Sequence, residues 1–172
     1  MRIKSLFVGL AAALIATASF AGRGSDGNVS IIYWQAPSIL NPYLSGGTKD
    51  IESSSMIIEP LARYNETGAL VPFLAEEIPT VANGGVSADL KSITWKLKSG
   101  LKWSDGSAVT SADVKFTGEY CMDPDGGCAQ LEKFDGVTDI ATPDDRTIVV
   151  SFSASKPNPC LLYTSPSPRD QV

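Results

Sequence analysis

Histidine is absent from this chain of 172 residues. It is the commonest metal ligand and the commonest general base near neutral pH, so most histidine-based hydrolase mechanisms are excluded within these residues. Basic residues are also few: without the first 21 residues, 12 of the 14 lysines and arginines remain against 19 acidic residues. Phosphate binding requires a basic patch, and the lysines are spread along the chain with acidic residues between them, so nucleic acid is not an expected partner.

Cysteine occurs three times, as Cys121, Cys128 and Cys160. The segment "MDPDGG" separates the first two, and its proline and two glycines favour a tight turn that would bring the two sulfur atoms together. The alternative is two unpaired thiols on a loop. We expect the Cys121–Cys128 disulfide, because exported proteins seldom keep two nearby thiols reduced. A zinc site would need two more good ligands, and none is nearby in the sequence, so we expect no metal and no cofactor.

The first 21 residues resemble a secretory signal peptide. "MRIK" is the positive region, "SLFVGLAAALIATASF" is the apolar region, and Ser19 and Ala21 are the small residues that a signal peptidase reads before Gly22. The alternative is a membrane anchor, but the apolar run is short for the roughly 20 residues that span a bilayer, and no stop-transfer cluster follows it. We therefore expect export and cleavage near Ala21.

The segment after the leader predicts a strand, a loop, a helix and a hairpin. "VSIIYW", residues 29–34, is an apolar run rich in β-branched residues and predicts a buried strand. Prolines and glycines then indicate a loop, after which Thr48 or Asp50 is expected to cap a helix through "IESSSMII", with residues 56–58 packed inward. Two short strands around residues 65–68 are typical of a hairpin.

The stretch "ITWKLKSGLKWSDGSAVTSADVKF" predicts a strand with one buried face, a turn and a helix. Apolar residues alternate with polar ones at Ile93, Trp95 and Leu97, and the alternation resumes at Leu101 and Trp103, so both tryptophans are expected in the core. Further along, residues 137–141 and 147–152 predict two strands joined across "TPDDR", with Pro143 and Asp144 beginning the turn.

The helix signal in this stretch is "TSAD", which follows the "SDG" turn. Thr110 or Ser111 is expected to accept hydrogen bonds from the first free amides, and Asp113 lies favourably at the positive end of the helix. Apolar residues recur at intervals of four and predict one buried face, formed by Ala112, Phe116 and Tyr120.

Four stretches resemble one protein family in their order and approximate spacing: "LNPYLSGG", "EPLARYNETGALVPFLAEEIP", "ITWKLKSGLKWSDGSAVTSADVKFTGEY" and "DDRTIVVSFSASKPNP". They are similar to the extracellular solute-binding proteins, family 5, which serve peptide, oligopeptide and nickel ABC importers. The resemblance covers nearly all of residues 29–159, and one departure is Gly118, where many members carry tryptophan.

The resemblance implies an α/β fold of the periplasmic binding protein type, with two lobes and a small extra domain. This chain would be an incomplete, α+β part of it: the signal peptide at 1–21, the start of lobe one with its first strand at 22–60, and most of the small β-rich domain at 61–159. The last residues, 160–172, have no hydrophobic periodicity and are rich in proline and serine, so we expect a non-native or disordered tail.

The resemblance also implies a function. The parent protein would be a monomeric receptor, not an enzyme, that captures a peptide or related small solute in the periplasm and delivers it to ABC importer permease subunits in the membrane. Because such receptors trap the ligand by closing two lobes about a hinge, this chain alone is not expected to bind it. The alternative is an N-terminal fragment of a secreted hydrolase whose catalytic residues lie elsewhere.

Ligand contacts are expected from the loop after the first predicted strand, because loops at the carboxyl ends of strands line the cleft in α/β proteins. Glycines allow a ligand backbone to come close, and aromatic residues offer a flat apolar surface. The candidate residues are Trp34, Tyr43, Ser45, Gly46 and Gly47. The alternative is that the two aromatic residues belong to the core and that the glycines serve only the turn.

Overall fold

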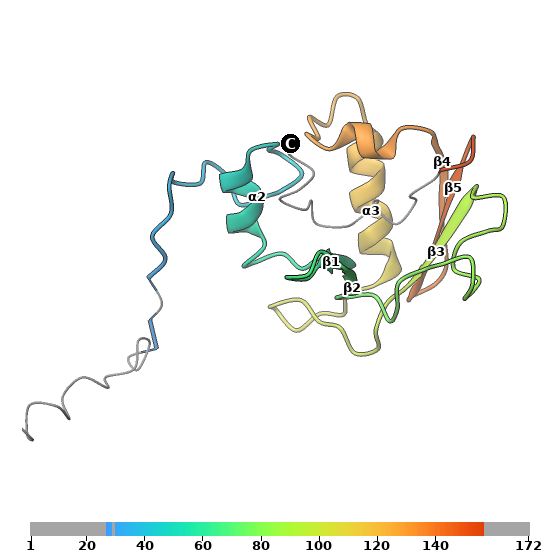
Figure 1. Ribbon diagram of the computed structural model, residues 1–172, viewed down its shortest axis with the longest axis horizontal. Helices are drawn as coiled ribbons and strands as arrows, with labels where there is room; N and C mark the ends of the chain where they lie inside the picture. Colours follow the sequence, from blue (N-terminus) through green and yellow to red (C-terminus); the bar gives the residue numbers. More distant parts are fainter. Residues whose placement is uncertain (1–26, 29, 157–172) are drawn as a thin grey trace, which may run out of the picture. The chain divides into compact units, whose positions relative to one another are not determined.

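The structure is a computed structural model that describes residues 27–28 and 30–156 (Figure 1). The chain divides into two compact units, Met1–Trp34 and Gln35–Val172, which are considered separately. The predicted signal peptide and the predicted tail with Cys160 lie outside the described residues. Within the described ranges, no helix is both long enough and apolar enough to cross a membrane.

In the first unit, residues 30–34 do not form the buried strand that the sequence predicted. These residues have no strand assignment, and the side chains of Ile32 and Trp34 are 99% and 69% exposed. A strand is stable only when another strand satisfies its backbone groups and covers one face. Within the described part of the chain, no strand pairs with these residues, so their β-branched side chains alone do not produce the strand.

The second unit begins with a loop and helix α2, Thr48–Ser54. The residue that precedes the first helical turn is Gly47, so the prediction that Thr48 or Asp50 caps the helix is wrong. The inward packing of residues 56–58 is wrong as well, because the helix ends at Ser54 and Met56 and Ile57 are each 64% exposed. The three serines at the end of α2 donate their hydroxyls to backbone carbonyls of the preceding turn, an interaction that weakens a helix.

Strands β1, Ala62–Tyr64, and β2, Leu70–Pro72, form the predicted antiparallel hairpin, with Tyr64 opposite Leu70. The side-chain oxygen of Asn65 accepts hydrogen bonds from the backbone amides of Thr67 and Ala69. An asparagine side chain that bonds amides two and four residues ahead stabilises a turn, which explains why the sequence signal was sufficient here.

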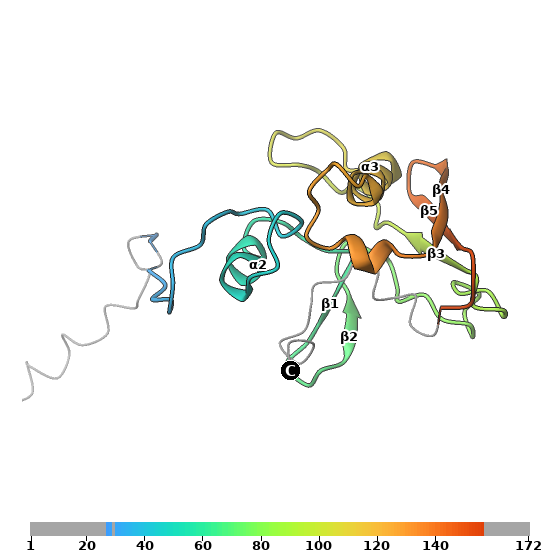
Figure 2. The same cartoon turned by 90° about the horizontal axis from the view of Figure 1, so that it is seen from above.

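A three-stranded antiparallel sheet of order β3-β5-β4 forms the centre of the second unit, with helix α3, Ser111–Met122, alongside it (Figures 1 and 2). The strands are β3, Ser92–Lys96, β4, Val137–Asp144, and β5, Thr147–Phe152. The short 3-10 helix η1, Leu131–Phe134, precedes β4. The predicted strands are confirmed, but β4 continues through Asp144, so the turn lies at residues 145–146 and does not begin at Pro143.

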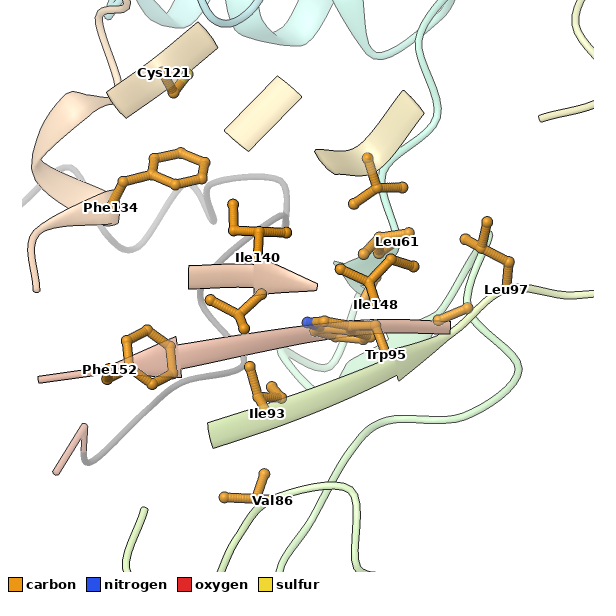
Figure 3. Packing of buried hydrophobic residues seen from close by; sticks show 14 residues of the cluster. Leu61, Val86, Ile93, Trp95, Leu97, Cys121, Phe134, Ile140, Ile148 and Phe152 are labelled. Atoms are coloured by element: carbon orange, nitrogen blue, oxygen red, sulfur yellow. The ribbon is translucent and has the colours of Figure 1, made fainter. Parts of the chain in front are cut away.

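The core lies between this sheet and α3, and Figure 3 shows Trp95 beside Ile148 within it. These two residues face each other across β3 and β5, and both are fully buried. The prediction of a buried Trp103 is wrong, since its side chain is 50% exposed. The chain turns at Gly100, which has φ 73°. In the described loop that follows, only an isolated bridge between Lys102 and Ala108 is formed, so the alternating pattern does not continue as a strand that would bury Trp103.

Helix α3 begins with the predicted capping box: the Thr110 amide donates to Asp113 at 2.7 Å, and the Thr110 side chain accepts from the helix backbone. The predicted buried face is wrong for Phe116, which is 69% exposed, and for Ala112, which is exposed, whereas Tyr120 is half-buried against the core. The buried residues are Ser111, Val114, Gly118 and Cys121. The Ser111 hydroxyl donates to the Asp144 carbonyl at 2.6 Å, and this bond ties the first turn of the helix to the end of β4.

Candidate ligand-contacting loop

The buried carboxylate of Asp50 organises the loop that precedes α2. Its Oδ1 accepts hydrogen bonds from the backbone amides of Ser38, at 2.6 Å, and Ile39, at 3.3 Å. Its Oδ2 accepts a hydrogen bond of 2.7 Å from the Ser45 hydroxyl. Asp50 therefore ties both ends of residues 38–45 to the first turn of the helix.

Lys49 forms an ion pair with Asp50, with 2.9 Å between its Nζ and Oδ1, and also donates to the Ser38 hydroxyl. The hydrogen bonds from Lys49 and then Ser45 hold the pKa of Asp50 well below its usual range, although burial acts in the opposite direction. The carboxylate is therefore ionised at neutral pH and fully engaged within the loop.

Of the predicted site residues, Tyr43 is the one most integrated into the fold. Its ring is half-buried against the hydrophobic core, and burial raises the pKa of its hydroxyl to about 12. Its backbone amide donates to the Asn41 side chain at 2.9 Å, and its carbonyl accepts from the Ala129 amide at 2.7 Å. Both the amide and the carbonyl of Tyr43 are therefore held by hydrogen bonds within the protein.

Ser45, Gly46 and Gly47 follow on the same loop. The Ser45 hydroxyl donates to Asp50 and accepts from the Gly47 amide at 3.0 Å. Gly46 and Gly47 are outside the set of described glycines with positive φ, and Gly47 has φ −81°. A Cβ added to Gly46 would meet no atom within 4 Å, and one added to Gly47 would lie 3.4 Å from the Ser45 hydroxyl. Neither backbone conformation nor space within the described fold requires glycine at these two positions.

Trp34 belongs to the separate N-terminal unit and is considered by itself. Its side chain is 69% exposed, and its ring lies at 43° to the ring of Tyr33, with 6.1 Å between centroids. The other four predicted residues therefore lie together on one loop, and Trp34 does not belong to that loop. Among the residues that the structure describes, no group of three or more histidine, cysteine or carboxylate side chains could hold a metal ion.

The role of Asp50 in the loop was not predicted from the sequence. Asp50 was expected only as a possible helix cap, since aspartate is among the residues preferred immediately before the first helical turn. In the structure, the carboxylate instead reaches amides 11 and 12 residues earlier in the chain. The sequence signal was the set of small polar residues before the helix, but no short-range rule specifies so distant a partner.

The sequence profile of the bacterial extracellular solute-binding proteins, family 5 (middle region), matches residues 69–172 of this chain. The chain belongs to this family. Two relatives illustrate the likeness. The probable peptide ABC transporter periplasmic-binding protein of Sinorhizobium fredii is 40% identical over 73 residues, 42% of this chain and 13% of the relative. The periplasmic murein peptide-binding protein MppA of Escherichia coli is 31% identical over 88 residues, 51% of this chain and 15% of the relative.

A solved structure is similar as well. The periplasmic binding protein AgaA from A. tumefaciens R10, in complex with agropinic acid, matches with a TM-score of 0.66 and 31% identity over 74% of this chain and 25% of AgaA. The match confirms the prediction that this mixed helix and strand chain has part of the two-lobed fold of periplasmic binding proteins. The chain spans about one quarter or less of the length of these three relatives.

Proposed function

We propose that this chain is part of the substrate-binding receptor of an ABC importer. The receptor captures a peptide or related small solute in the periplasm and delivers it to membrane permease subunits. Family membership over residues 69–172 is the observation that carries the proposal, and the names of relatives from Sinorhizobium fredii and Escherichia coli support a peptide as solute. The family consists of solute-binding proteins, and none of these comparisons supports the alternative of a secreted hydrolase.

The loop before α2 is the part of the second unit that we propose as ligand-contacting, with Tyr43, Ser45, Gly46 and Gly47 as the candidate residues. Trp34, in the N-terminal unit, is a separate candidate contact. Gly46 provides the strongest structural support. It is exposed, and neither its backbone conformation nor its neighbours require a residue without a side chain. A glycine that the described fold does not need is expected where another molecule comes close to the backbone.

Their surroundings suggest different roles for the other candidates. The carbonyl of Tyr43 and the hydroxyl of Ser45 already accept or donate hydrogen bonds within the protein, so these two residues shape the loop. Trp34 offers an exposed aromatic face of the kind that packs against an apolar part of a solute.

Growth tests the proposed transport function. A strain with the full-length gene should grow on peptides as its nitrogen source, and a strain with the gene deleted should grow more slowly on the same peptides but equally well on ammonium. Equal growth of the two strains on every peptide tested would contradict the peptide-receptor proposal.

The proposed contact is tested in the full-length protein with Gly46→Trp, which fills the open space beside the loop. Binding of the peptide that supports growth should weaken at least tenfold, or about 1.4 kcal/mol. The matched control is Glu66→Trp, an equally bulky replacement in the exposed turn between β1 and β2, which should leave affinity unchanged. If folded Gly46→Trp binds as tightly as the control, the loop does not contact the ligand.

A further inference from the structure

The disulfide predicted from the sequence is present and joins Cys121, in the last turn of α3, to Cys128. The Cα atoms of the two cysteines are 5.0 Å apart. Cys121 is fully buried in the hydrophobic core, and Cys128 is half-buried against it. The disulfide therefore attaches the segment around Cys128 to the hydrophobic core of the unit.

The segment between the two cysteines is held in one conformation. The Gly126 amide donates to the Asp123 carbonyl at 3.0 Å. A Cβ at Gly126 would lie 2.8 Å from the Tyr120 carbonyl, and Gly127 has φ 69°, a conformation that favours glycine. The tight turn and the disulfide together fix the position of Cys128, and so of the residue that follows it.

The residue that follows Cys128 contacts the candidate ligand-contacting loop. The Ala129 amide donates to the Tyr43 carbonyl at 2.7 Å. Figures 1 and 2 agree that the segment before η1 lies beside the loop that leads to α2. The hydrogen bonds of Asp50 and Ser45 close the loop on itself, whereas the Ala129 bond attaches it to a distant part of the chain.

We propose that the Cys121–Cys128 disulfide is a positioning element for the candidate ligand-contacting loop. It fixes Ala129 so that the Ala129 amide holds Tyr43, and the position of Tyr43 then determines how Gly46 is presented three residues later. The importance of this position for a solute rests on the proposed function. The positioning itself is a property of the protein without solute, so it can be tested separately.

Hydrogen–deuterium exchange of the chain, with and without Cys128→Ser, tests the proposal. This variant opens the disulfide but leaves Cys121 in place in the core. Amide exchange in residues 38–47 should become faster by at least about tenfold, because local opening costs less free energy once the anchor is lost. Exchange in β3 and β5 should change little. The matched control, Asp125→Ala, alters an exposed residue between the two cysteines and should leave exchange in residues 38–47 unchanged.

A second variant, Ala129→Pro, removes the donor and leaves both cysteines in place. It should raise exchange in residues 38–47 as Cys128→Ser does. Unchanged exchange in residues 38–47 in either variant would overturn the proposal. An equal loss of protection in β3 and β5 in Cys128→Ser would overturn it as well, since the disulfide would then stabilise the whole unit without a specific effect on the loop. Neither outcome bears on whether the parent protein transports peptides, which the growth experiment decides.

Discussion

Replacing Trp95 with phenylalanine should change stability far less than its complete burial suggests. Trp95 is a fully buried side chain, and no acceptor within the described part of the chain bonds its indole N–H. A buried donor without a partner costs about 1–3 kcal/mol relative to its state in water. Phenylalanine keeps an aromatic ring beside Ile148 and removes this donor.

The opposing cost comes from lost volume. Phenylalanine is smaller by roughly 40 Å³, and at about 24 cal/mol per Å³ the resulting cavity costs about 1 kcal/mol. The lost apolar contact adds about 1 kcal/mol. Because these losses and the relief of the unpaired N–H are similar in size, Trp95→Phe should lie within about 1 kcal/mol of the parent chain, whereas Trp95→Ala should cost about 3–5 kcal/mol.

Urea denaturation followed by circular dichroism measures the difference, provided that the slope of the unfolding free energy against urea is the same for each variant. Trp103→Phe is the matched control: its side chain is 50% exposed, and its free energy of unfolding should stay within about 0.5 kcal/mol of the parent. If Trp95→Phe costs more than about 3 kcal/mol, the indole N–H has a favourable partner and the reasoning is wrong.

Two further predictions concern the helix starts. Thr110→Ala removes the capping box of α3 and should lower the free energy of unfolding by about 1 kcal/mol, read from the urea midpoint; an unchanged midpoint would show that the box contributes nothing. Asp50→Asn should lower the melting temperature most above about pH 4, where the carboxylate of the parent chain is ionised in both the folded and the unfolded protein. Because folding lowers the pKa of Asp50, its stabilising contribution is lost as pH falls toward that lowered pKa, so the difference between variant and parent should shrink in acid. A difference independent of pH would contradict the role of the charge.

Local signals predicted the elements that local interactions determine. The hairpin around residues 65–68 has its own Asn65 side-chain bonds, and the capping box of α3 is closed by Thr110 and Asp113, three residues apart. In β3 and β5, buried residues alternate with residues that are mostly half-buried. The disulfide was also predicted from the local sequence, since its two cysteines are seven positions apart across a tight turn.

The wrong predictions concern features that depend on distant parts of the chain. Helix α3 packs against β4, and its Ser111 hydroxyl bonds the Asp144 carbonyl 33 residues away, so an apolar repeat at intervals of four could not reveal which face is buried. The segment at residues 30–34 has side chains suited to a strand but no described strand to pair with, and it is not a strand. For the candidate loop, sequence indicated the glycines, whereas the roles of Asp50 and Ala129 depend on contacts that only the fold creates.

The strand order β3-β5-β4 has a consequence for when the chain can fold during synthesis. β5 is the central strand, and it is also the last of the three to leave the ribosome. Until residue 152 is available, β3 and β4 have no common neighbour, and the residues that will surround Trp95 are incomplete. Closing such long loops is slow compared with forming local contacts. The sheet and the surroundings of Trp95 therefore cannot be completed before β5 has been synthesised.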